Sequence, residues 1–220
     1  MTLKIDSKLS ARFPDLNAFT FQVDDVTIHK RDAELEKFKR EVIKKVREKY
    51  DLDAVKDQPT FRAYRDFFWK IRIDPTKIRP AAEALIRRIL AGKNLPGINT
   101  LVDAYNLASI KSRIALATYD TDELKGNLLM RFATQGEQLY GIEMDKPLVL
   151  KGGEIVVSDD EKLVAVYPYR DADNTKVTAK TKNVTIVVCG VPGIPEETLV
   201  DASRVALEYV TRFCGGENRK

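Results

Sequence analysis

The stretch that most constrains this chain is residues 99–133, because it passes from helical to strand periodicity within one short segment. A helix start at Asn99 or Thr100 is followed by apolar residues at the i, i+3, i+4, i+7 spacing of a half-buried helix. These apolar residues are Leu101, Val102, Tyr105 and Ala108. The pattern ends at residues 111–113. The segment therefore predicts a helix packed against a neighbouring layer.

Two strands are predicted after this helix. Residues 114–119 alternate as a strand does and end in an acidic corner, and Gly126 then turns the chain into a second strand over residues 128–132. Polar side chains stand where a plain core does not need them, at Asn106 and Ser109 on the helix and at Asp120 beside the strand end. We therefore look for a functional site here.

The remaining segments predict an α+β architecture. A strand with a turn at Asp24-Asp25 is expected over residues 19–29, and helices over residues 30–50, 59–71 and 80–92. After the central stretch come short apolar runs at residues 139–142, 148–150, 155–157, 163–169 and 184–188, separated by turn signals. A last helix opens at Pro195 and stops at Gly215-Gly216. Helices, a meandering sheet and a closing helix together indicate an α+β domain.

Composition sets limits on location and chemistry. No apolar run approaches the roughly 20 residues of a membrane helix, and the first residues lack the apolar region of a signal peptide, so we expect no membrane association and a cytoplasmic protein. The two cysteines, Cys189 and Cys214, fit a reducing compartment, and without CxxC spacing or a neighbouring His they predict no metal site. No cofactor is expected.

Charge favours an anionic partner only weakly, since 37 Lys and Arg residues stand against 33 Asp and Glu residues. Lys44 and Lys45 lie on the predicted helix 30–50, and Arg87-Arg88 on the predicted helix 80–92. These four residues are the candidate RNA contacts. The alternative is a merely solvated face, because glutamates are interleaved along the first of these helices.

Searches for common catalytic motifs find nothing. The sequence contains no GxGxxG, no GxxxxGK[ST] and no GxSxG. The single histidine, His29, lies in a strand-like segment, so the sequence does not favour a catalytic triad that contains histidine. Asp120-x-Asp122 resembles half of a calcium loop, but turn closure explains it better, and Arg170-Asp171 can be read as a local ion pair. The residues alone indicate no particular reaction.

Several short motifs, taken together and in their order along the chain, give more information about function than any single residue. The matching residues, spread over roughly half the chain, are Leu101-Val102-Asp103, Asn106, Tyr119-Asp120-Thr121-Asp122, Arg131, Ala133, Gly136-Glu137, Thr181-Lys182-Asn183-Val184 and Cys214-Gly215-Gly216-Glu217. Each motif alone is weak, but in this order and spacing they resemble the B3/B4 editing domain of the phenylalanyl-tRNA synthetase beta subunit.

The resemblance implies a three-layer α+β fold, with a β-sandwich of unusual topology flanked by helices. Residues 1–98 do not match the synthetase; their EALIRR segment at residues 83–88 resembles freestanding members of the superfamily. We therefore expect residues 1–98 to be an extension packed on a domain of residues 99–217, in one structural unit. The resemblance also implies a pocket that, in the synthetase, hydrolyses tyrosine wrongly attached to the phenylalanine tRNA, so the implied partner is the aminoacylated 3′ end of a tRNA.

Several pocket positions depart from the synthetase pattern. Ala117 stands where the synthetase has a His, and Val187 where a Glu reads the tyrosine hydroxyl. Tyr105 replaces a Thr, and a glycine pair falls near Tyr167-Pro168. A buried acceptor is what permits strong selection for a substrate hydroxyl. Tyrosine is therefore not the expected substrate; either catalysis is lost or it acts on another aminoacyl group.

Our hypothesis from the sequence is a freestanding aminoacyl-tRNA deacylase acting in trans. Asn106, Ser109 and Thr181 orient ligand or water; Asp120 or Glu154 grips the α-amino group; and Arg170 binds the ester carbonyl or a phosphate. The remaining pocket residues are Tyr105, Tyr167, Asp171 and Val187. Each assignment competes with a capping or ion-pair role.

Two other classes of function stay open. One is a non-catalytic tRNA-binding module that uses Arg87, Arg88, Lys44 and Lys45. The other is a protein that binds a small amino-acid-like molecule. A homo-oligomer is a possible assembly for all three.

Overall fold

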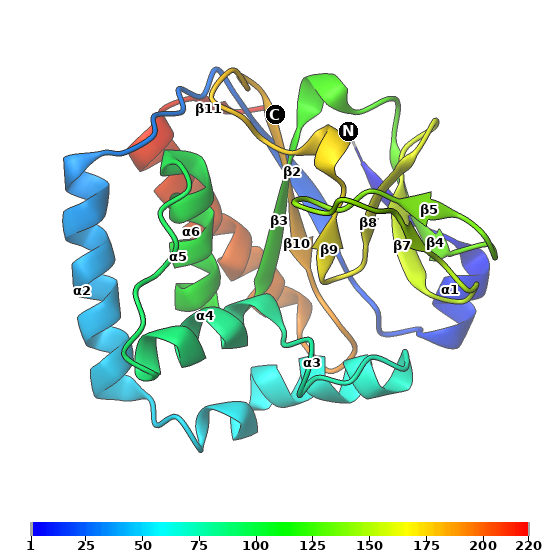
Figure 1. Ribbon diagram of the computed structural model, residues 1–220, viewed down its shortest axis with the longest axis horizontal. Helices are drawn as coiled ribbons and strands as arrows, with labels where there is room; N and C mark the ends of the chain where they lie inside the picture. The colour runs from blue at the N-terminus through cyan, green and yellow to red at the C-terminus, as the bar shows by residue number, and fades with distance from the viewer. Residues whose placement is uncertain (1, 220) are drawn as a thin grey trace.

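The chain folds into three layers, as the computed structural model, which describes residues 2–219, shows in Figure 1. Helices α5 (Thr100–Ser112) and α6 (Glu196–Cys214) form one outer layer, a four-stranded sheet the middle layer, and a five-stranded sheet the other outer layer. This confirms the predicted three-layer α+β fold. Within residues 2–219, no helix is both long enough and apolar enough to cross a lipid bilayer.

The middle sheet is antiparallel and holds the most deeply buried strands. In spatial order its strands are β11 (Glu217–Asn218), β2 (Phe19–Asp24), β10 (Val184–Cys189) and β3 (Ala115–Asp120). Every residue of β3 and β10 is buried, because α5 and α6 cover one face and the five-stranded sheet covers the other. Burial on both faces explains why these strands read as nearly continuous apolar runs.

The outer sheet is built mainly from the second half of the chain. Its order is β1 (Leu3–Ile5), β4 (Leu128–Phe132), β7 (Ile155–Ser158), β8 (Leu163–Val166) and β9 (Arg170–Asp171). Only the β1–β4 pair is parallel. A small ribbon of β5 (Gln138–Leu139) and β6 (Leu148–Val149) lies beside it.

Four more helices and three 3₁₀ turns complete the chain. The helices are α1 (Ser7–Arg12), α2 (Ala33–Lys49), α3 (Pro59–Lys70) and α4 (Ala81–Leu90), and the turns are η1 (Val55–Asp57), η2 (Thr121–Glu123) and η3 (Asp173–Thr175). Side-chain caps fix the helix starts: Asn99 accepts the Val102 N–H at 2.9 Å, and Asp32 accepts the Leu35 N–H at 2.7 Å. Arg113, at φ 66°, ends α5 in the left-handed conformation.

Some predicted elements are shorter than the sequence suggested. The predicted strand 19–29 ends at Asp24, because Asp25 takes φ 58° and the Val26 N–H then bonds to the Lys182 carbonyl instead of continuing the ladder. The predicted strand 163–169 ends at Val166, before a cis peptide at Tyr167-Pro168. The strands β1, β9 and β11 were not predicted, since two or three residues carry no readable alternation.

The first part of the chain contributes strands to both sheets. β1 pairs with β4, and β2 lies between β10 and β11. The aromatic residues Phe61, Tyr64 and Phe68 of α3 are fully buried and belong to the core, whereas the neighbouring Trp69 is 56% exposed. The division of the chain at residues 98 and 99 stays a prediction.

A buried ion pair joins α2 to α5. Lys39 Nζ lies 2.6 Å from Asp103 Oδ2 and 2.9 Å from Glu36 Oε1. Burial by itself lowers the pKa of Lys39, but the hydrogen bonds to Asp103 and Glu36 outweigh it and raise this pKa overall. Both ends of the Lys39–Asp103 pair are buried, so each charge depends on the other for its solvation.

Lys39→Ala should therefore lower the free energy of unfolding by about 3–5 kcal/mol, because it leaves the Asp103 carboxylate buried without its counter-charge. Urea denaturation at pH 7 measures this loss. The matched control is Lys44→Ala on the same helix, whose side chain is 80% exposed and which should change stability by less than about 0.5 kcal/mol. Equal losses in the two variants would contradict the role given to the buried pair.

Candidate functional site

The candidate site lies between the two sheets, at the β3 edge of the middle sheet. Tyr119 of β3 points toward the outer sheet, because its Oη donates a hydrogen bond to Asp171 Oδ1 of β9 at 3.0 Å. Alternation along β3 places Ala117 on the same face, and the register adds its cross-strand partner Val187 and the Tyr119 partner Thr185. This face therefore carries the Tyr119 phenol, the Thr185 hydroxyl and the apolar side chains of Ala117 and Val187, and the Asp171 carboxylate of β9 lies opposite the phenol.

Asp171 is the most perturbed acid of the site. Burial raises its pKa to about 6, while the hydrogen bond from Tyr119 and the nearby charge of Arg170 act in the opposite direction. Burial, and after it the charge of Asp171, raises the phenol pKa of Tyr119 and of Tyr105, which reaches the site from α5. At neutral pH the two phenols are therefore hydrogen-bond donors, and Asp171 is an anion able to accept a proton.

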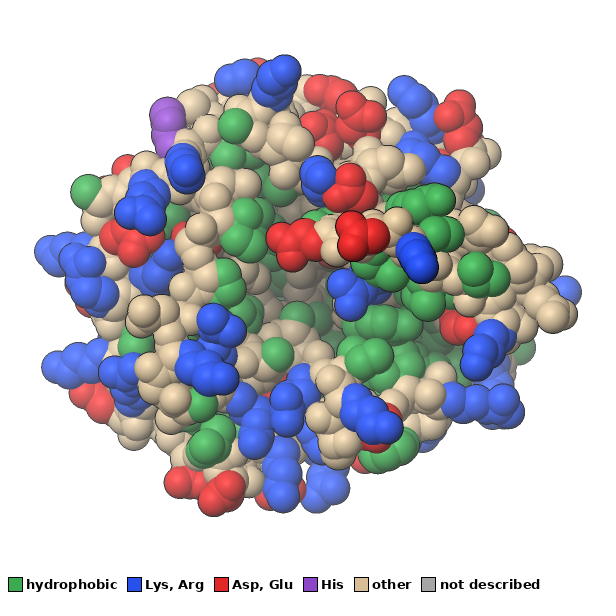
Figure 2. Space-filling model, viewed as in Figure 1, with side chains coloured by type: hydrophobic (Ala, Val, Ile, Leu, Met, Phe, Trp, Pro, Cys, Tyr) green, Lys and Arg blue, Asp and Glu red, His purple; other side chains and the backbone are tan. Residues whose placement is uncertain are grey.

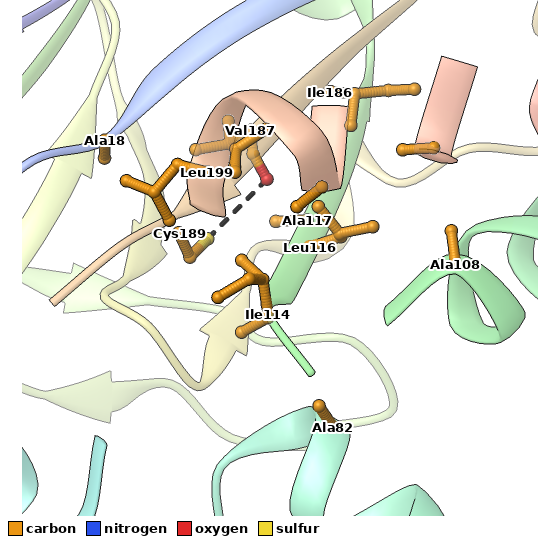
Figure 3. Packing of buried hydrophobic residues seen from close by; sticks show 14 of the residues in the cluster. Ala18, Ala82, Ala108, Ile114, Leu116, Ala117, Ile186, Val187, Cys189 and Leu199 are labelled. Atoms are coloured by element: carbon orange, nitrogen blue, oxygen red, sulfur yellow. Dashed lines mark hydrogen bonds between the residues drawn. The ribbon is translucent and has the colours of Figure 1, made fainter. Parts of the chain in front are cut away.

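The positions that the family resemblance assigns to the pocket are apolar and packed. Ala117 is 7% exposed and Val187 1% exposed, and both belong to the main hydrophobic cluster. Figure 3 shows them on neighbouring strands, with the Cys189 thiol pointing back to the Val187 carbonyl. Burial raises the pKa of Cys189 and keeps its thiol protonated. This wall offers van der Waals contact and no polar side-chain group.

Three predicted site residues make hydrogen bonds within the fold. Ser109 donates to the Ile114 carbonyl at 2.5 Å, which holds the chain as it leaves α5. Thr181 donates to Asp120 Oδ2 at 2.5 Å, and Asp120 also accepts the Asp122 N–H. The Asp120–Thr181 pair therefore ties the end of β3 to the loop before β10.

The other predicted pocket residues lie around this centre. Tyr167 is buried and donates to the Gly190 carbonyl, which ties the end of β8 to the end of β10. Asn106 is half-buried beside Tyr105, and its amide makes no hydrogen bond within residues 2–219. Arg170 is exposed and its stem lies against Gly141; the described residues contain no Arg170–Asp171 ion pair, because adjacent strand residues point to opposite faces.

Glu154 lies in a different place. It lines a recess of about 820 Å³ bordered by α1, the loop after α3, and the turn between β6 and β7. Asp171, Tyr119 and Tyr105 are not among the residues lining that recess. The structure therefore divides the predicted substrate-binding residues between two sites.

The predicted RNA contacts lie on a basic surface formed by α2, α4 and the loop after α4. Arg87 and Arg88 donate to the carbonyls of Leu52 and Asn94, at 2.9 and 2.5 Å. Lys44 and Lys45 are both exposed, but Lys45 does not line the recesses of this surface. Two shallow recesses meet at Lys93, and the Lys and Arg residues lining them, which we call the basic surface, are Arg40, Lys44, Arg47, Arg79, Arg87, Arg88 and Lys93.

Figure 2 shows Lys and Arg side chains outnumbering Asp and Glu on the part of this face where Figure 1 places α2. Glu48 is the one acid lining the two recesses. Sequence reasoning found part of the surface but missed Lys93 and Arg79, since they stand outside the periodic helix faces. In residues 2–219, no group of three or more His, Cys, Asp or Glu side chains is arranged to hold a metal ion.

Sequence reasoning also missed Tyr119 as a site residue. The sequence did contain a signal for this residue, because Tyr119 lies two residues after Ala117 on the same strand, and the two side chains therefore point to the same face of the sheet. What could not be read was that β9 would place Asp171 opposite it. That pairing depends on how the outer sheet lies over the middle one.

The layered fold and the position of the site define a class, the α+β domains in which two packed sheets adjoin a layer of helices. The sequence model of the B3/4 domain matches residues 63–215. The chain belongs to the B3/4 domain family.

The similar curated proteins are beta subunits of phenylalanine–tRNA ligase. That of Fusobacterium nucleatum is 32% identical over 117 residues, which is 53% of this chain and 14% of that protein. That of Bartonella henselae is 27% identical over 146 residues, covering 56% of this chain and 18% of that protein. The chain therefore corresponds to a small part of these ligase subunits.

A solved structure supports the fold. An N-terminal fragment of the phenylalanyl-tRNA synthetase beta subunit from Pyrococcus horikoshii superposes with a TM-score of 0.54 at 15% identity. The match covers 99% of this chain and 50% of that fragment. Residues before the family-model match thus also have counterparts in that architecture.

The raised pKa of Asp171 makes stability depend on pH. A folded-state pKa of about 6, against 3.8 for an ordinary Asp, means that folding favours the protonated acid. As the pH rises from 4 to 6.5, the free energy of unfolding of the wild-type protein should fall by up to about 3 kcal/mol relative to that of Asp171→Asn. Above this range the difference should stay constant. Urea midpoints of both proteins across this range measure the difference; a constant difference would contradict the shifted pKa.

Proposed function

We propose that this protein hydrolyses the ester bond of an aminoacyl-tRNA in trans, with Asp171 as the general base. The observation that carries the proposal is the Asp171–Tyr119 pair, which adjoins the Ala117–Val187 wall where the family resemblance puts the substrate's side chain. A base with a pKa of about 6 is largely ionised at neutral pH and still close enough to it to transfer a proton efficiently.

The proposed hydrolysis proceeds through one tetrahedral intermediate, and the proton taken up by Asp171 is returned to the leaving group. Asp171 accepts a proton from a water molecule whose oxygen attacks the ester carbonyl carbon, giving a tetrahedral oxyanion. The Tyr105 phenol is the available donor to this oxyanion, since it stays protonated at neutral pH, whereas the Tyr119 hydroxyl already donates its hydrogen to Asp171. Collapse breaks the bond to the ribose oxygen, which takes the proton back from Asp171. The products are a free amino acid and an uncharged tRNA.

The wall sets the proposed substrate class. Ala117 and Val187 have no hydrogen-bond acceptor in their side chains, so they cannot bind a hydroxyl group on the substrate side chain. An apolar aminoacyl group fits this wall better than tyrosine does. Asn106, which follows Tyr105 on α5 and whose amide makes no hydrogen bond within residues 2–219, is the residue we assign to orient the water or the α-amino group.

The test is a panel of tRNAs charged with apolar and polar amino acids, scored for loss of the ester label. Asp171→Asn should reduce kcat/KM about 10²–10⁴-fold, the usual contribution of a general base. Wild-type kcat/KM should rise with pH up to about 6 and then level off. Tyr119→Phe should move that inflection upward, because the Tyr119 hydrogen bond lowers the pKa of Asp171.

Asp173→Asn is the matched control, since this acid lies two residues away, forms an ion pair with Lys176 and makes no hydrogen bond with Asp171, Tyr119 or Tyr105 within residues 2–219. It should leave hydrolysis unchanged. If neither wild-type protein nor control cleaves any member of the panel, or if Asp171→Asn cleaves at the wild-type rate, the proposed mechanism is wrong.

The basic surface favours a second candidate function, an RNA-binding module without turnover. Its two recesses place seven cations against one acid, which suits the regularly spaced phosphates of an RNA backbone. Arg87 and Arg88 are held by backbone carbonyls, so their positive ends are partly fixed before any ligand arrives.

Salt dependence tests this second candidate. Lys93→Gln and Arg47→Gln should each weaken tRNA binding for all tRNAs alike and reduce the slope of log K against log salt by about 0.7–0.9, the value for one lost phosphate contact. Filter binding from 50 to 300 mM salt measures the slope. Arg204→Gln, an exposed arginine on α6, is the control and should change neither affinity nor slope.

A further inference from the structure

The recess that holds Glu154 combines three kinds of group. Its floor is apolar and partly aromatic, with Phe13, Phe132 and Tyr169 among the lining residues. Its volume of about 820 Å³ lies within the range of small-molecule sites. Figure 2 shows hydrophobic side chains at the floor of a hollow below and to the right of the centre of this face, with Lys and Arg groups along its border.

One carboxylate oxygen in this recess is buried without a partner. Glu154 Oε1 accepts the Lys151 N–H at 2.9 Å, whereas Oε2 is shielded from solvent and has no hydrogen-bond partner in residues 2–219. The Glu154 carbonyl also accepts the Ala133 N–H, so backbone contacts hold the residue in place. A buried acceptor of this kind is satisfied when a ligand brings a donor.

The aromatic floor lies next to this oxygen. Tyr169 and Glu154 line the same recess, and burial, followed by the charge of Glu154, raises the phenol pKa of Tyr169. The ring of Tyr169 also packs edge-on against Phe68 of α3, at 6.5 Å between centroids, which restricts its motion. Phe132 is half-buried in the same recess.

The rim of the recess carries positively charged side chains that form no salt bridges within residues 2–219. Five exposed cations line it, Arg12, Lys70, Arg72, Lys77 and Lys151, against the two carboxylates of Asp74 and Glu154. None of the five forms a salt bridge with another residue in the range 2–219. Asp74 Oδ1 is occupied by the backbone N–H and the hydroxyl of Thr76. The rim is therefore arranged to meet an anion.

We propose that this recess binds one unpaired nucleotide whose base carries an exocyclic amine, as cytosine, adenine and guanine do and uracil does not. The base lies on the apolar floor against Tyr169 and Phe132, its amine donates to Glu154 Oε2, and its phosphate meets the cationic rim. Carboxylates accept from the cytosine N4 amine, and single-stranded bases are recognised by aromatic contacts combined with hydrogen bonds to their edges. A zwitterionic amino acid would leave most of the rim unpaired.

Uracil provides the discriminating comparison. Its one ring N–H donor lies between two carbonyl oxygens, which repel a carboxylate placed to accept from it. The recess should therefore prefer CMP over UMP by about tenfold, the usual effect of one hydrogen bond to a charged group. The inference goes beyond the proposed ester hydrolysis, because the binding of a free nucleotide involves neither Asp171 nor any tRNA.

Isothermal titration of the full chain with CMP, UMP and cytidine is the experiment. CMP should bind about tenfold tighter than UMP and also tighter than cytidine, which lacks the phosphate. In Glu154→Gln, the amide oxygen can keep the bond to the Lys151 N–H, so the NH₂ group replaces Oε2 and turns an acceptor into a donor. This variant should lose the preference for CMP and bind UMP at least as tightly as it binds CMP.

Glu161→Gln is the matched control, an exposed glutamate in the turn between β7 and β8, and it should keep the wild-type preference. Oligocytidine binding much tighter than CMP would identify the natural source as an RNA strand, and equal affinity would identify a free nucleotide. Equal affinities of the wild-type protein for CMP and UMP, or cytidine binding as tight as CMP, would overturn the proposal even if Glu154→Gln failed to fold.

Discussion

The burial of the middle sheet on both faces is the constraint on which the structure depends. The strands β3 and β10 lie under α5 and α6 on one side and under the outer sheet on the other, so every one of their residues is out of solvent. A polar group that enters this space must be satisfied inside it. Tyr64 illustrates this, since its hydroxyl bonds to the Cys189 carbonyl and accepts the Ala115 N–H at the ends of these two strands.

The same constraint gives the candidate site its chemistry. Asp171 faces the space between the sheets and lies where water is scarce, which explains both its raised pKa and its dependence on the Tyr119 hydroxyl. Asp120, by contrast, is tied to Thr181 and to the turn after β3. The two aspartates look alike in the sequence, and only their hydrogen bonds separate a reactive group from a structural one.

Local signals made much of the fold readable from the sequence. The helix start at Asn99 and the spacing of Phe61, Tyr64 and Phe68 predicted helices that the structure contains. What could not be read depends on distant pairing. The Asp171–Tyr119 contact joins strands 52 residues apart, and the Glu154 recess collects side chains from α1, α3 and β4, none of which shares a sequence pattern with the others.

The strand order has a consequence for how the chain reaches this fold during synthesis. β1 and β2 leave the ribosome first, but their partners β4 and β10 begin only at Leu128 and Val184. Neither sheet can close before most of the polypeptide exists, and until then both early strands expose unpaired backbone edges. The helices α2 to α5 form from local contacts in the meantime, so we expect these helices to assemble first and to serve as part of the surface onto which β10 condenses.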